Sequence, residues 1–191
     1  MVKPFTIFDE KTAPKESQAM LKAAKEDFGM IPNLEGVMAA APSLLSCYVQ
    51  NWAAFQTNSF TEIERQVIYM TVNFENNCEY CVPWHSKLSE MANMPTDEIE
   101  NLRHGRALND HKLNVLHQFT QSIVRTHGSI TPADLRVFLD AGYTQQNALE
   151  VILGVSIKVM SNYTNALAQT PLDTEVANLS WKKPSLRFNG L

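Results

Sequence analysis

Two cysteines and a histidine in segment 77–85 have the residue types and the spacing for thiol chemistry. The segment reads NCEYCVPWH, so Cys81 follows Cys78 by three residues and His85 follows Cys81 by four. Residues four apart in a helix lie on the same face, one turn from each other. His85 can therefore take the proton of Cys81 or stabilise its thiolate as an imidazolium. The spacing predicts a redox-active thiol with an attached base.

Reactivity at this segment depends on forming a thiolate, because the thiolate is the nucleophile and a free cysteine has a pKa of about 8.5. A helix N-terminus carries partial positive charge and would lower that pKa, as would a hydrogen bond from the other thiol. A thiolate at Cys81 can attack a peroxide to give a sulfenic acid, which Cys78 converts into a disulfide. It can equally attack a disulfide of a partner protein. The residues alone leave both reactions open.

The helical periodicity of the sequence predicts an all-α fold that holds this segment at the N-terminus of a helix. Pro83 lacks an N–H group and fits only the first turn, so this helix should start between residues 79 and 81 and end near residue 93. The preceding helix should open with a capping box of Thr61 and Glu64 and end near residue 76. The other predicted helices span residues 17–28, 34–41, 43–56, 96–104, 110–126, 132–140 and 145–168.

Several residues outside the motif have predicted environments. Gln66 lies on the apolar stripe of its helix and is expected to point inward. Cys47 is expected to be a small buried residue. The tail, residues 170–191, is expected to be irregular, with Trp181 and Phe188 as anchors for the protein's own core or for a neighbouring subunit. The other histidines are expected at the surface or at helix ends: His104, His111, His117 and His127.

The bulk composition indicates one globular domain over residues 1–191. Apolar residues make up 45% of the chain and charged residues 19%, which is typical of a globular protein. The net charge of −4 and the absence of a basic run argue against a nucleic-acid partner. No apolar stretch approaches the roughly 20 residues of a membrane-spanning helix, and the N-terminus lacks the apolar core of a signal peptide. We therefore expect a cytoplasmic protein without a membrane partner.

The same motif could in principle hold a metal ion or a structural disulfide. Cys78, Cys81 and His85 offer three ligands, whereas a closed zinc site needs four, and no further cysteine or histidine follows at a tight spacing. In a reducing cytosol, a Cys-x-x-Cys is more often catalytic or metal-binding than structural. We therefore expect neither a metal nor another cofactor.

The sequence around the motif resembles the AhpD-like alkylhydroperoxidases of the carboxymuconolactone decarboxylase superfamily. The resembling residues are TEIERQVI from Thr61, VNFENNCEYC from Val72 and on to His85, AGYTQQNALEVI from Ala141, and NYTNAL from Asn162. Together these segments place the family-like core at about residues 35–168. The resemblance implies an all-α, AhpD-like helical bundle that assembles as a homo-oligomer.

The resemblance also implies an activity and a role for each motif residue. AhpD-like proteins reduce hydroperoxides, with a thiol or dithiol protein as the reductant. By their pattern, Cys81 is oxidised to the sulfenic acid, Cys78 donates a proton and resolves it, and His85 belongs to a proton relay. True lactone decarboxylases of the superfamily lack the cysteine pair, which argues against decarboxylation here.

Two positions depart from the family's pattern. The relay glutamate of the family stands twelve residues before the first cysteine, where this chain has Gln66. An amide cannot accept a proton at neutral pH, but it can orient His85 or a water, and Glu62, one turn earlier on the same face, could supply a carboxylate. The best-known members have a second histidine where this chain has Tyr80. Tyr80 and Trp84 adjoin the thiols and are candidate pocket residues.

The leading functional hypothesis is therefore a peroxidase that reduces hydroperoxides through the cysteine pair. One alternative is a disulfide reductase, or a redox-sensing oligomeric adaptor without peroxidase turnover. A lyase of the lactone decarboxylase type is the least favoured reading.

Overall fold

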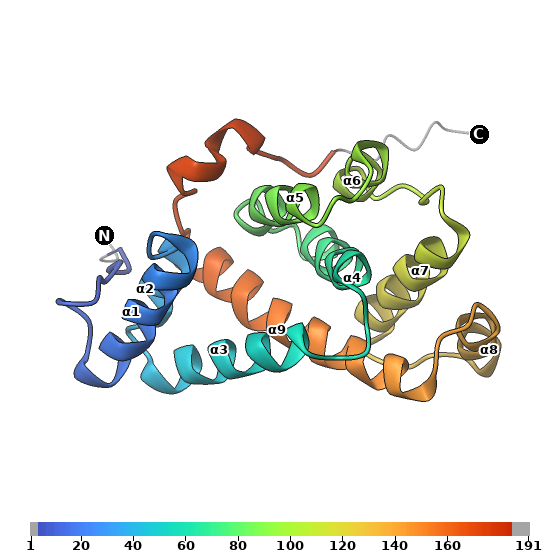
Figure 1. Ribbon diagram of the computed structural model, residues 1–191, viewed down its shortest axis with the longest axis horizontal. Helices are drawn as coiled ribbons and strands as arrows, with labels where there is room; N and C mark the ends of the chain where they lie inside the picture. The colour runs from blue at the N-terminus through green and yellow to red at the C-terminus, as the bar shows by residue number, and fades with distance from the viewer. Residues whose placement is uncertain (1–3, 185–191) are drawn as a thin grey trace.

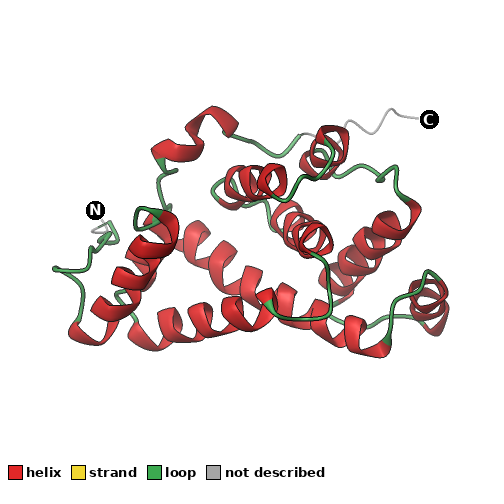
Figure 2. Cartoon of the chain, in the orientation of Figure 1, coloured by secondary structure: helices red, strands yellow, loops and turns green. Residues whose placement is uncertain are grey.

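The structure, a computed structural model, describes residues 4–184, and within that range it contains helices and loops but no strand (Figure 2). The α-helices are α1 Lys15–Phe28, α2 Asn33–Met38, α3 Pro42–Gln56, α4 Glu62–Glu75, α5 Cys81–Met91, α6 Thr96–Arg103, α7 His111–Thr126, α8 Pro132–Asp140 and α9 Gln145–Ala168. A 3-10 helix covers Thr174–Leu179. The predicted all-α fold is confirmed.

The local signals read from the sequence explain where the helices around the motif begin. At the start of α4, the Glu64 N–H donates to Thr61 Oγ1 (3.2 Å), while the Thr61 N–H donates to the Glu64 carboxylate (2.9 Å). This reciprocal pair is the predicted capping box. Helix α5 begins at Cys81, which places Pro83 in the first turn, where its missing N–H costs no helical hydrogen bond. The thiol pair therefore stands at a helix N-terminus.

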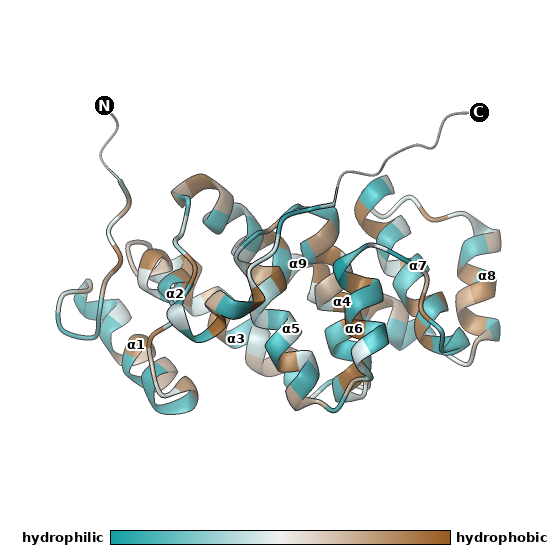
Figure 3. Ribbon diagram, turned by 90° about the horizontal axis from the view of Figure 1, so that it is seen from above, coloured by the Kyte–Doolittle hydropathy of each residue, from teal (hydrophilic) through white to brown (hydrophobic). Residues whose placement is uncertain are grey.

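Helices α4 and α9 form the centre of the arrangement (Figure 1). Helix α4 packs against α5, α6, α7 and α9, while α9 also contacts α2 and α3. Figure 3 shows hydrophobic stretches on α4 and α9 in the middle of the molecule. Gly154 permits the close approach of α9, because a Cβ there would lie 2.8 Å from Ile68 and 2.9 Å from Phe55. The packing brings one face of α9 against the start of α5.

The C-terminal tail is more ordered than its sequence predicted. The 3-10 helix Thr174–Leu179 packs against α5, so the expectation of a wholly irregular tail is wrong. Trp181 is buried, its ring packs against Phe74, and its Nε1 donates to the Arg103 carbonyl (2.8 Å). The tail is thus anchored on the protein's own core. The second expected anchor, Phe188, lies outside the described residues.

Two predicted environments are wrong. Cys47 is exposed, because Tyr48 and Phe55 belong to the inward face of α3 and Cys47 points away from it. His117 is buried rather than at the surface. Its Nδ1 lies 2.7 Å from the Thr71 hydroxyl, a hydrogen bond of the kind that a buried polar ring requires.

Within residues 4–184, none of the helices combines the length and the apolar character needed to cross a membrane.

Candidate active site

The two cysteines of the motif are buried free thiols at the N-terminus of α5. Cys78 lies in the turn that follows α4, and its N–H donates to the Asn73 carbonyl (3.0 Å). Cys81 is the first residue of α5, and its N–H donates to the Cys78 sulfur (3.2 Å). These backbone hydrogen bonds hold the Cys78 sulfur against the first residue of α5.

A polar stripe on α9 faces the two thiols. The stripe consists of Lys158, Ser161, Asn162 and Asn165, and all four side chains are buried. The Asn165 amide donates to the Cys81 sulfur at 3.3 Å and lies 3.9 Å from the Cys78 sulfur. The Ser161 hydroxyl oxygen lies 4.0 Å from the Cys81 sulfur, as an acceptor for the thiol. Through Asn165, helix α9 thus supplies a hydrogen-bond donor to the sulfur that the family resemblance assigns as the nucleophile.

His85 lies between α4 and α9 and has a partner at each ring nitrogen. Its Nδ1 lies 2.8 Å from Gln66 Oε1, and its Nε2 lies 2.9 Å from Lys158 Nζ. Because an amide oxygen only accepts and an ammonium only donates, the ring must carry its proton on Nδ1 and accept from Lys158 at Nε2. Gln66 is buried and points inward, as expected. Glu62 is exposed and does not reach the ring.

The protonation of His85 follows from these contacts. Burial lowers the pKa of His85 well below its usual value, and the charge of Lys158 lowers it further. The imidazole is therefore neutral at physiological pH, and the positive charge in the site belongs to Lys158. Both ring nitrogens of His85 are engaged, one by Gln66 and the other by Lys158, and neither is hydrogen-bonded to a cysteine sulfur. Among the described residues, no group of His, Cys, Asp and Glu side chains is placed to hold a metal ion.

The pKa values of the two thiols are shifted in opposite directions. Burial raises the pKa of Cys81, but the hydrogen bond from Cys78, the charge of Lys158 and the amides of Asn162 and Asn165 outweigh it and bring the pKa to about 6. The hydrogen bond to Cys81, together with burial, raises the pKa of Cys78 far above its usual value. At neutral pH, Cys81 is the thiolate and Cys78 holds the proton.

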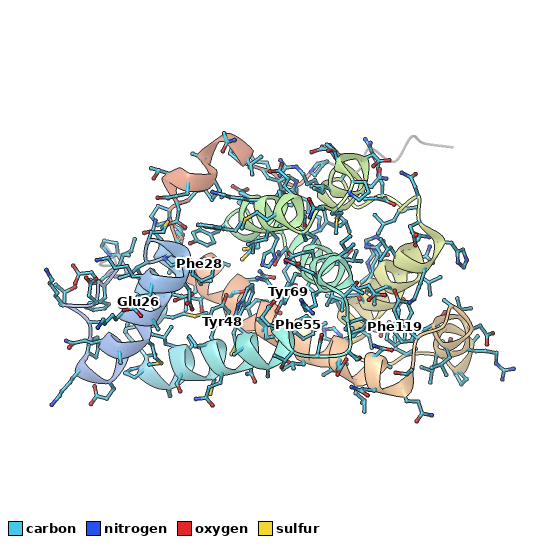
Figure 4. The ribbon with its side chains drawn as sticks, viewed as in Figure 1. Glu26, Phe28, Tyr48, Phe55, Tyr69 and Phe119 are labelled. Carbon is cyan, nitrogen blue, oxygen red and sulfur yellow. The ribbon has the colours of Figure 1, made fainter. Side chains whose placement is uncertain are left out.

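Cys81 opens onto an aromatic-lined cavity between the N-terminal helices and α5. The space open to the centres of water molecules is about 50 Å³, and roughly 10–15 Å³ of such space holds one water. A few waters, or the oxygens of a small peroxide, therefore fit beside the sulfur. In Figure 4, Phe28 and Tyr48 lie on the side of α1 and α3 that faces α4 and α5. The lining residues are Phe28, Pro32, Leu34, Glu35, Tyr48, Trp52, Tyr80, Cys81, Trp84, His85, Leu88 and Lys158.

The predicted pocket residues Tyr80 and Trp84 line this cavity and are tied to the tail by Asp173. The buried Asp173 carboxylate accepts hydrogen bonds from the Trp84 indole (2.7 Å), from the Asn33 N–H (3.0 Å) and from the Tyr80 hydroxyl. The same hydroxyl accepts from the Leu34 N–H (3.1 Å). One carboxylate thus joins α2, the thiol turn and the tail.

Replacing Asp173 by asparagine is expected to lower the free energy of unfolding by about 1–3 kcal/mol, because it weakens charge-assisted hydrogen bonds to buried donors. Urea denaturation measures the change. Glu175→Gln, at an exposed position of the 3-10 helix that follows Asp173, is the matched control and should be neutral. Equal stability of the two variants would contradict a structural role for Asp173.

Comparison with known proteins identifies the fold that carries this site. Neither the protein-family models nor the curated protein sequences contain a match to the chain. The fold matches the crystal structure of an alkylhydroperoxidase AhpD core, an uncharacterized peroxidase-related protein from Ralstonia eutropha JMP134. The TM-score is 0.80 at 15% identity, over 92% of this chain and 96% of that one. The chain has an AhpD-like fold.

Two further structures share the AhpD-like fold. One is an uncharacterized peroxidase-related protein from Silicibacter sp. TM1040, with a TM-score of 0.77 and 21% identity over 92% of this chain and 97% of that one. The other is the debrominase Bmp8 in complex with 2,3,4-tribromopyrrole, with a TM-score of 0.72 and 14% identity over 91% and 94% of the two chains. The AhpD-like fold therefore occurs with more than one named activity.

The sequence predicted the thiols, His85 and Gln66 as site residues, but the polar stripe of α9 was not predicted. A signal was present, because the polar residues of α9 recur at intervals of three and four in an otherwise apolar segment. In this chain, that spacing marks a polar face that is buried against the thiols. The buried acids Glu35 and Asp173 left no such periodic signal.

Proposed function

We propose that this protein is a thiol-dependent oxidoreductase that reduces hydroperoxides through Cys81 and Cys78. The observation that carries the proposal is the placement of two neighbouring buried thiols at a cavity, with the Asn165 amide donating a hydrogen bond to the Cys81 sulfur. Burial opposes the Cys81 thiolate, yet its hydrogen-bond donors and Lys158 hold its pKa near 6. A thiolate that is present at neutral pH and opens onto a small cavity is suited to attack a peroxide.

The proposed reaction has two balanced steps. First, the Cys81 thiolate attacks the terminal peroxide oxygen, so that an S–O bond forms, the O–O bond breaks, and the alkoxide leaves with the electron pair and takes up a proton. The sulfur is thereby oxidised to a sulfenic acid and the peroxide is reduced to an alcohol. Second, Cys78 attacks the Cys81 sulfur, the S–O bond breaks, and the hydroxide leaves as water with the proton of Cys78.

In this scheme, Lys158 supplies the positive charge that stabilises the Cys81 thiolate, and His85 holds the Lys158 ammonium in place. The neutral imidazole accepts a hydrogen bond from the Lys158 ammonium, and Gln66 holds the ring in the required tautomer. A glutamine suffices behind His85 because this arrangement transfers no proton through that position. The thiolate is stabilised by a fixed charge rather than by a histidine that accepts its proton.

The two thiols face different openings, which suggests separate routes for oxidant and reductant. Cys81 lines the aromatic cavity, whereas Cys78 lines a surface pocket with Asn77, Glu79 and Thr170. We propose that a thiol or dithiol reductant attacks the Cys78 sulfur of the disulfide from this pocket. The released group would be the Cys81 thiolate, and a thiol of low pKa is the better leaving group.

Reductive dehalogenation is a second candidate, favoured by the aromatic rings around Cys81. Phe28, Tyr48, Trp52, Tyr80 and Trp84 line the cavity, and one protein of the same fold is a debrominase. The balanced reaction converts an aryl bromide and two thiols into the arene, the disulfide, bromide and a proton.

The expected homo-oligomer also stays a proposal, with exposed apolar residues on α9 available to a second copy.

Rapid mixing of the reduced protein with cumene hydroperoxide tests the proposed function. We expect one disulfide between Cys78 and Cys81 for each peroxide consumed, and continued turnover when dithiothreitol is present. Cys47→Ser is the control and should react like the wild type, because Cys47 is exposed and outside the site. Peroxide consumption that requires Cys47 would contradict the proposal. Bromide release from a bromopyrrole without any reaction with the peroxide would favour dehalogenation instead.

A further inference from the structure

Glu35, on α2, is a buried acid that the scheme above does not use. Its side chain is 6% exposed, and its Oε2 has no hydrogen-bond partner in the described part of the chain. It lines the same cavity as Cys81, His85 and Lys158. A buried carboxyl without a partner is costly, and its helix neighbours Leu34 and Val37 are apolar. Packing alone therefore does not account for an acid at this position.

The surroundings of Glu35 favour its protonated form. Burial raises the pKa of Glu35, and the nearby Asp27 carboxylate raises it further, to about 7. A group with this pKa can both give and take a proton near neutral pH, as a general acid must. The titratable and charged groups that face it or its cavity come from α1 (Asp27), α3 (Tyr48), the thiol turn and α5 (Tyr80, Cys81, His85) and α9 (Lys158).

Glu35 also lines a second cavity, which gives it contact with an external proton source. This cavity lies along α1 and α3, has about 180 Å³ open to the centres of water molecules, and includes the exposed Asp27. Glu35, Phe28, Tyr48 and Trp52 line both cavities. Among these four shared residues, only Glu35 can exchange a proton near neutral pH, because burial raises the pKa of Tyr48 well above its usual value.

We propose that Glu35 is the general acid that protonates the oxygen leaving the peroxide when Cys81 attacks it. The inference rests on the proposed peroxidase function and identifies the donor of the proton that the leaving oxygen requires. As the O–O bond breaks, the alkoxide or hydroxide takes the carboxyl proton of Glu35 and leaves as alcohol or water. The Glu35 carboxylate then recovers a proton from water in the second cavity. His85 cannot take this role, because both of its nitrogens are engaged.

The test compares two reactions of Cys81 that differ in their need for a proton. Peroxide reduction releases an alkoxide that must be protonated, whereas alkylation by iodoacetamide releases iodide, which needs no proton. In Glu35→Gln, we expect reaction with cumene hydroperoxide to slow by roughly 10²-fold, the lower range for loss of a general acid. Alkylation of Cys81 should be unchanged or faster, because the substitution only removes negative charge near the thiolate. Glu26→Gln on α1, which is exposed, is the matched control and should change neither rate.

A series of peroxides with different leaving groups sharpens the same test. The loss in Glu35→Gln should be largest for alkyl hydroperoxides, whose alkoxides are strongly basic. It should be smallest for a peroxy acid, whose carboxylate leaves without a proton. Equal slowing of alkylation and peroxide reduction, or an unchanged peroxide rate, would overturn the assignment of Glu35 while the proposed function stands. A wild-type protein that reacts with iodoacetamide but with no peroxide would overturn the proposed function, and the assignment with it.

Discussion

Substitution of Cys81 by serine is expected to abolish peroxide reduction, with a loss of at least about 10³-fold, because an alcohol is a weak nucleophile without a dedicated base. Serine also cannot form the sulfenic acid or the disulfide. The Asn165 amide that now donates to the sulfur can donate to the hydroxyl instead, so the fold should be retained. Peroxide consumption in the presence of dithiothreitol measures the loss, and circular dichroism checks the fold.

Cys78→Ser is the matched variant for this prediction, because it removes the neighbouring thiol and leaves Cys81 in place. Here one equivalent of peroxide should still be consumed, and the sulfenic acid should persist long enough to be trapped by dimedone. No disulfide should form. The opposite pattern, with the trapped acid at Cys78 in Cys81→Ser, would reverse the proposed roles of the two cysteines.

Replacing Lys158 by methionine should have the second large effect, because it removes the fixed charge beside the thiolate. The charge of Lys158 lowers the pKa of Cys81, so its removal should raise that pKa. Each unit of increase lowers the thiolate fraction about tenfold when the pH lies below the pKa. The pH at which half of Cys81 alkylates at its maximal rate should rise from about 6 toward the ordinary value of a cysteine.

The measurement is the rate of iodoacetamide alkylation of Cys81, resolved by peptide mass spectrometry. The pH is varied from about 5 to about 9, so that the series includes the ordinary cysteine pKa of about 8.5. Lys87→Met is the control, because Lys87 lies beside Trp84 on the outer side of α5 (5.9 Å from the ring) and carries the same charge. Its profile should match the wild type. A Lys158→Met profile that also matches the wild type would show that hydrogen bonds alone set the pKa of Cys81.

The stability of Lys158→Met should move differently from its reactivity. Lys158 is 1% exposed and packs over the Tyr69 ring at 5.3 Å. Methionine removes the cost of burying a charge, but it leaves the buried His85 Nε2 without its donor, which costs about 1–3 kcal/mol. These two effects oppose each other, so we expect a melting temperature close to that of the wild type together with a slower thiol. Circular dichroism checks that the variant keeps its helices.

The helices could be predicted from the sequence because their signals are local. Thr61 and Glu64 cap α4 as their spacing indicates, and Pro83 fixes the start of α5. The inward position of Gln66 follows from its place on the apolar stripe of α4. These features need only neighbours within a turn or two, which the sequence displays directly.

The electrostatics of the site could not be predicted in the same way, because they depend on contacts between distant segments. Lys158 meets His85 across 73 residues, and Asn165 meets Cys81 across 84. Glu35 lies at the cavity because α2 packs against α1, α3 and α9. From the motif alone, His85 is the base next to the thiol. In the folded chain it is a neutral ring that holds an ammonium.

The position of the polar stripe on α9, far along the chain from the cysteines, has a consequence for when the protein becomes reactive. During synthesis, Cys78 and Cys81 emerge long before Lys158 and Asn165. Until α9 docks, both cysteines should titrate like free thiols, near pH 8.5, and react slowly with oxidants. The sensitive thiolate would thus arise only in completed molecules. A chain that is still being synthesised, or that lacks α9, would therefore resist oxidation at these cysteines.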